Sequence, residues 1–75
     1  MRGNSSAKEL PPYKARVIEE AAQLEDKLRA LDAFLETDTC AALMRDEQAS
    51  LHAQRLAMRQ YLDALHGRIA IWGWR

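Results

Sequence analysis

Two basic residues could bind an anion, because the helices expected to carry them supply no counter-ion. On a helix, a solvated lysine or arginine often has a carboxylate three or four residues away. Lys27 and Arg68 have none at these positions. Their neighbours at these offsets are instead Gln23, Leu24, Ala30 and Leu31 for Lys27, and Ala64, Leu65, Ile71 and Trp72 for Arg68. Lys14 and Arg55 lack such a partner as well.

A cation beside an apolar stripe has two interpretations, and the sequence leaves both open. In the commoner one, the aliphatic stem covers apolar neighbours while the charged head stays in water. In the other, the cation binds an anion at a subunit interface, where a charge-assisted hydrogen bond is strengthened by the exclusion of water.

Tyr13 favours the anion-binding interpretation, although it too has a commoner structural role. It precedes Lys14 near the expected start of a helix, where the helix dipole is positive. A flat aromatic ring beside cations can seat a nucleobase and its phosphate, whereas the structural role is packing onto Val17. Tyr13 and Lys27 are 14 residues apart, or about 21 Å along one helix. A shared site should therefore lie between subunits, with Tyr13 of one chain near Lys27 of another.

Catalytic and metal-binding arrangements are not expected. The sequence has no glycine-rich phosphate loop, nucleophile motif or metal-ligand spacing. His52 and His66 are 14 residues apart and cannot share a metal within one helix. We interpret both as surface or interface residues, and Cys40 as a small buried side chain. We therefore predict no catalytic residue, no metal and no cofactor.

The elements that must position these residues are predicted from two repeats of alternating spacing four and three, which is typical of helical seams. The first repeat consists of Val17, Ala21, Leu24, Leu28, Leu31 and Leu35. The second consists of Leu51, Arg55, Met58, Leu62, Leu65, Ile69 and Trp72, with arginine as its polar member.

These repeats predict an all-α fold in one domain spanning residues 1–75. Long helices are expected over residues 12–36 and 46–72, paired as an antiparallel hairpin. Asp46 is the expected N-cap of the second, and Gly73 its expected end. Residues 1–10 are expected to form an arm or a short helix.

Self-association is expected because the chain has only 75 residues. A core of this size contributes little net stability, and a single cysteine excludes an internal disulfide. Neither seam can cover the other completely. The large apolar residues left over as a contact surface for another subunit are Leu56, Tyr61, Ile71, Trp72 and Trp74.

Composition bounds the partners and the location. Eleven basic and eleven acidic residues give a net charge of zero, which argues against binding of a DNA or RNA polymer. Both ends of the chain are nevertheless locally positive, which suits a small anion. We expect no membrane association, because no apolar run is long enough to span a bilayer. The polar start and the lone thiol indicate a cytosolic protein.

Two segments resemble the anti-CBASS type 2 family of small phage proteins, which are cyclic-oligonucleotide sponges. The first runs from residue 12 to residue 34: Pro12-Tyr13-Lys14-Ala15-Arg16-Val17-Ile18-Glu19-Glu20, then Leu24-x-x-Lys27-Leu28-x-x-Leu31-x-x-Phe34. The second comprises Asp46-Glu47-Gln48-x-x-Leu51, Gln54, Met58-x-x-Tyr61 and Leu65-x-x-Arg68-Ile69.

The resemblance implies a homohexamer that traps the signals of bacterial CBASS immunity in the host cytoplasm without cleaving them. Cyclic dinucleotides such as cyclic GMP–AMP would bind between subunits. By position in the motif, Tyr13 would pack on the bases and Lys27 would bind phosphate. Lys14 lies beside that tyrosine as a further candidate ligand. Some family members bind cyclic trinucleotides at a second interface, for which Arg68 is the matching arginine.

An enzyme is not favoured, because no acid–base pair or metal cluster is apparent in the sequence. Two other function classes remain open. One is sequestration of a cyclic nucleotide. The other is a structural or adaptor coiled-coil bundle that binds a partner protein, which the two seams and the tryptophan-bearing tail suit equally well.

Overall fold

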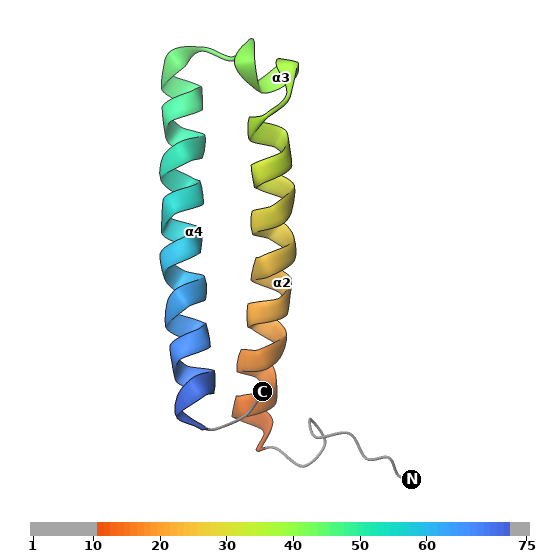
Figure 1. Cartoon of the computed structure of the whole chain (residues 1–75), viewed down its shortest axis with the longest axis vertical. Coiled ribbons are helices and arrows are strands. Elements are labelled where there is room, and N and C mark those ends of the chain that lie inside the picture. The colour runs from red at the N-terminus through yellow and green to blue at the C-terminus, as the bar shows by residue number, and fades with distance from the viewer. Residues whose placement is uncertain (1–10, 73–75) are drawn as a thin grey trace, which may run out of the picture.

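The computed structural model describes residues 11–72, which are helical apart from short connections and contain no strand, so the predicted all-α class is confirmed. The helices are α2 (Pro12–Leu35), α3 (Asp38–Ala41) and α4 (Arg45–Ile71). The long helices α2 and α4 run antiparallel beside each other, and α3 lies in the turn between them (Figure 1). The interpretations of residues 1–10, Gly73 and Trp74 fall outside the described residues.

The helix starts follow from local chemistry. Pro12 is the first residue of α2, where a missing backbone N–H costs nothing because that group has no intrahelical partner. The expectation that Asp46 caps α4 is wrong, because Met44 is the N-cap. The Glu47 carboxylate accepts a hydrogen bond from the Met44 backbone N–H at 3.4 Å, which fixes the earlier start. Asp46 instead lies in the first turn, where its charge favours the helix dipole.

Two polar side chains build the turn. Thr37 Oγ1 donates to the Phe34 carbonyl at 2.7 Å and accepts from the Cys40 N–H at 3.1 Å, which joins the end of α2 to the start of α3. Gln48 Nε2 donates to the carbonyls of Ala41 and Leu43 at 3.1 and 2.9 Å. Carbonyls left free at the end of α3 are thereby satisfied. Cys40 is buried in this turn, as predicted.

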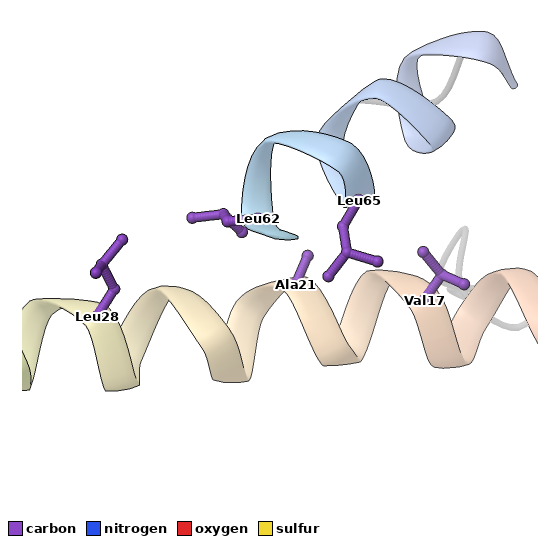
Figure 2. Close-up of a cluster of buried hydrophobic side chains, with 5 residues drawn as sticks. All are labelled: Val17, Ala21, Leu28, Leu62 and Leu65. Carbon is purple, nitrogen blue, oxygen red and sulfur yellow. The ribbon is translucent and has the colours of Figure 1, made fainter. Parts of the chain in front are cut away.

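A narrow core joins α2 to α4. Figure 2 shows Val17, Ala21 and Leu28 of α2 directed toward Leu62 and Leu65 of α4. These are seam positions of the two repeats, and Leu65, at 1% exposure, is the most deeply buried. The spacing therefore identified the core side of each helix correctly.

The hairpin leaves most of its sides uncovered. Its radius of gyration is 16.4 Å, whereas a compact domain of this length would have about 11 Å. Leu56, Tyr61 and Ile71 are exposed, as predicted from the pattern. Trp72 differs from that prediction, because it is half-buried and packs against the core cluster. A lone hairpin thus exposes apolar surface that a second copy could cover.

Candidate functional site

Three of the polar positions on α2 share one side of the helix. Tyr13, Glu20 and Lys27 follow one another at intervals of seven residues. Seven residues are nearly two full helical turns, so each side chain lies above the last, about 10 Å further along the axis. All three are exposed.

A matching pair lies on α4. Tyr61 and Arg68 are also seven residues apart and exposed. The Tyr61 hydroxyl donates a hydrogen bond to the Glu20 carboxylate, which places this pair on the same side of the hairpin as the α2 positions. We call this surface the Tyr61 face and define it by Tyr13, Glu20, Lys27, Tyr61 and Arg68.

Lys27 remains the residue of most interest on this face. Its side chain is exposed, and within residues 11–72 it forms no ion pair or side-chain hydrogen bond. Lys27 has no carboxylate three or four residues away on α2, and α4 does not supply one either. The ammonium is free to bind an anion brought by a ligand or by another subunit.

Tyr13 and Lys14 lie at the open end of the hairpin, where the end of α4 contacts them. The rings of Tyr13 and Trp72 are 6.1 Å apart between centroids at an interplanar angle of 84°, an edge-to-face contact. Lys14 Nζ lies 5.1 Å from the centroid of the Trp72 ring, within cation–π range. Trp72 thus contacts both Tyr13 and Lys14, whereas Lys27 of the same chain lies about 21 Å from Tyr13 along α2.

Arg68 lies within electrostatic reach of Tyr61. Its positive charge acts to lower the pKa of that phenol, although the net effect of the surroundings is opposite. The hydrogen bond to Glu20, followed by desolvation and the Glu20 charge, raises the pKa of Tyr61 above the ordinary value of 10.0. Lys27 and Arg68 outnumber the one carboxylate of the Tyr61 face, Glu20, so this face suits an anionic partner.

The Tyr61 hydrogen bond predicts a specific response to alkaline pH. A raised pKa means that the neutral phenol stabilises the fold, and that this contribution is lost as the pH rises through the folded-state pKa. In a Tyr13→Phe variant Tyr61 is the remaining tyrosine of the two, and its absorbance titration should have a midpoint above 10.0. Adding Glu20→Gln should lower that midpoint, and an unchanged midpoint would show that this hydrogen bond does not form.

On the opposite side of the hairpin, two carboxylates of α2 have partners on α4. The Glu25 carboxylate accepts a hydrogen bond from His66 Nε2 at 2.9 Å, and Asp32 accepts one from Arg55 Nε. The polar member of the second seam thus obtains its counter-ion from α2 rather than from its own helix. Both pairs are partly exposed and contribute little stability, but they give Asp32 and Glu25 partners across the hairpin.

Metal binding and membrane insertion find no support in the described part of the chain. No group of three or more histidine, cysteine, aspartate or glutamate side chains between residues 11 and 72 could hold a metal ion. His52 and His66 are both exposed, as interpreted from their spacing. Neither long helix contains a stretch apolar enough to cross a membrane.

Two contacts of the site are not predictable from the sequence pattern. Glu20 lies four residues from Arg16, a spacing that favours a pair on the same helix, but its carboxylate accepts a hydrogen bond from the Tyr61 hydroxyl across the hairpin. Trp72 was expected to be free contact surface, but it contacts Tyr13 and Lys14. The seven-residue intervals along each helix were the available signal for a common face.

Comparisons with known proteins found one family model and a phage relative that match most of the chain. The family model Sequestin matches residues 11–71. A protein of Enterobacteria phage T4, described as an uncharacterized 7.5 kDa protein in the denB-rIIB intergenic region, is 41% identical over 58 residues. That alignment covers 77% of this chain and 91% of the phage T4 protein. No solved structure matches the chain.

Proposed function

This chain belongs to the Sequestin family, the anti-CBASS family of cyclic-nucleotide sponges, and we propose that it sequesters a cyclic dinucleotide such as cyclic GMP–AMP. It holds the nucleotide intact, without catalysing its cleavage, and thereby keeps it from its effector. Its place of action is the cytoplasm of the infected host. Cyclic trinucleotides are a second ligand class, for which Arg68 supplies the phosphate contact.

The observation that carries this proposal is the uncompensated charge of Lys27. It is an exposed ammonium without a counter-ion among residues 11–72, on a face that also carries Tyr13 and Arg68. A phosphate supplies the missing anion through a charge-assisted hydrogen bond. The Tyr13 ring, with 51% of its surface exposed, supplies stacking worth about 1–3 kcal/mol per base.

The ligand lies between two subunits. Fourteen residues separate Tyr13 from Lys27, which is about 21 Å along α2 and too far for one small ligand. Leu24 and Leu31 are half-buried beside the α2 part of the Tyr61 face. A second hairpin that brings its own Tyr13 toward Lys27 would therefore cover this apolar surface. The assembly we propose is a homohexamer.

A stoichiometric sponge needs high affinity. Nanomolar dissociation corresponds to about −12 kcal/mol, which a small ligand reaches most readily in a preformed site that loses little entropy on binding. Two rigid helices that present the ligand contacts meet this requirement better than flexible loops would.

The test is a calorimetric titration of the whole chain with a panel of cyclic di- and trinucleotides, together with its mass in solution. We expect tight binding of at least one cyclic dinucleotide and a mass near six times the chain mass of 8.6 kDa. The bound nucleotide should be recovered intact after denaturation. A monomer without heat of binding would overturn the proposal and leave the helical adaptor, while a linearised nucleotide would indicate an enzyme.

A further inference from the structure

We infer that Trp72 is a positioning residue that holds Tyr13 and Lys14 ready for the nucleotide. The inference rests on the proposed function, since it assumes that Tyr13 stacks on a base. It goes further by assigning a role to a residue at the end of α4, on the helix opposite the one that carries the stacking tyrosine.

The geometry supports an anchored contact. Trp72 packs against the core cluster formed by residues such as Val17 and Leu65. Its ring also meets the Tyr13 ring edge-to-face, with 6.1 Å between centroids and 84° between planes. Trp72 is therefore anchored by the core and at the same time contacts a tyrosine that is 51% exposed.

This contact restricts Tyr13 without occupying it. Tyr13 lies in the first turn of α2, where its ring would otherwise sample several rotamers. Because the two rings are perpendicular, Trp72 covers at most one face of Tyr13, and the half-exposed Tyr13 ring keeps surface for stacking on a base. Fixing the ring before binding reduces the entropy lost when the ligand arrives.

The same indole also holds a cation. Lys14 Nζ lies 5.1 Å from the centroid of the Trp72 ring, and this attraction keeps the ammonium beside Tyr13 without neutralising its charge. A carboxylate in that place would hold the lysine equally well but would cancel the positive charge that a phosphate needs. Trp72 therefore organises both the stacking ring and the adjacent positive charge.

A double-mutant cycle with Tyr13 tests this role. Trp72→Ala should weaken cyclic GMP–AMP binding about tenfold by calorimetry, which corresponds to roughly 1.4 kcal/mol for an aromatic pair. Trp72→Phe keeps an aromatic ring and should stay within about threefold of the unmodified chain. In a Tyr13→Ala background, Trp72→Ala should cause a clearly smaller further loss, because the positioned ring is already absent and only the contact with Lys14 remains to be lost.

The alternative outcomes are distinct. If the unmodified chain binds no cyclic nucleotide, the proposed function fails. If it binds, but Trp72→Ala costs the same factor with and without Tyr13, Trp72 does not position Tyr13 and the inference is wrong. Trp72→Leu repeats the cycle should the alanine variant not fold, since leucine keeps apolar volume against the core and removes the ring.

Discussion

Replacing Lys27 with alanine is expected to abolish tight binding of cyclic GMP–AMP while the oligomer persists. The side chain is exposed and has no ion pair to lose within residues 11–72, so its removal should leave the fold intact. A hydrogen bond to a charged group contributes about 1.5–3 kcal/mol, and leaving a phosphate unpaired adds to the loss. We expect calorimetry to show an affinity weaker by a factor of about ten to a hundred or more. The mass in solution should stay unchanged.

Two variants serve as controls for this experiment. Lys27→Arg keeps the charge and should retain part of the affinity, because guanidinium also binds phosphate but with a different geometry. Arg29→Ala removes a cation two positions further along the same helix. Arg29 is 76% exposed and already paired with Asp26 at 3.2 Å, so its loss should leave binding unchanged. Undiminished binding by Lys27→Ala would remove this lysine from the site.

Replacing Leu65 with alanine should produce the largest loss of stability. Leu65 is 1% exposed and is the most deeply buried of the five side chains in the core cluster. Truncating a buried leucine costs about 2–5 kcal/mol, because transfer energy is lost and a cavity remains. For a chain this small, that is a large share of the total free energy of unfolding. Denaturant unfolding followed by circular dichroism should show the loss directly.

Leu56→Ala is the matched control, since it makes the same change on the same helix. Leu56 is 56% exposed, so within a single hairpin the substitution should change the free energy of unfolding by less than about 0.5 kcal/mol. Both variants should be measured at several protein concentrations, because subunit association adds a concentration-dependent term. Equal losses at all concentrations would contradict the arrangement of the core.

The helices and their buried sides were predictable because the signals are local. A four–three spacing of apolar residues selects one side of a helix whatever its surroundings, and Val17, Leu62 and Leu65 are buried accordingly. The start of α4 was less predictable. Asp46 and Met44 lie within one turn of each other, and either could be the N-cap. The hydrogen bond from the Met44 backbone N–H to the Glu47 carboxylate decides for Met44.

The lack of a counter-ion for Lys27 and Arg68 on their own helices could also be read from the sequence, because it depends only on offsets of three and four residues. The partners across the hairpin could not. Whether Glu20 serves Arg16 or Tyr61, and whether Trp72 faces solvent or Tyr13, depends on the register between α2 and α4. That register is set by how the two apolar stripes interlock, an interaction between residues about forty to sixty positions apart that no local pattern encodes.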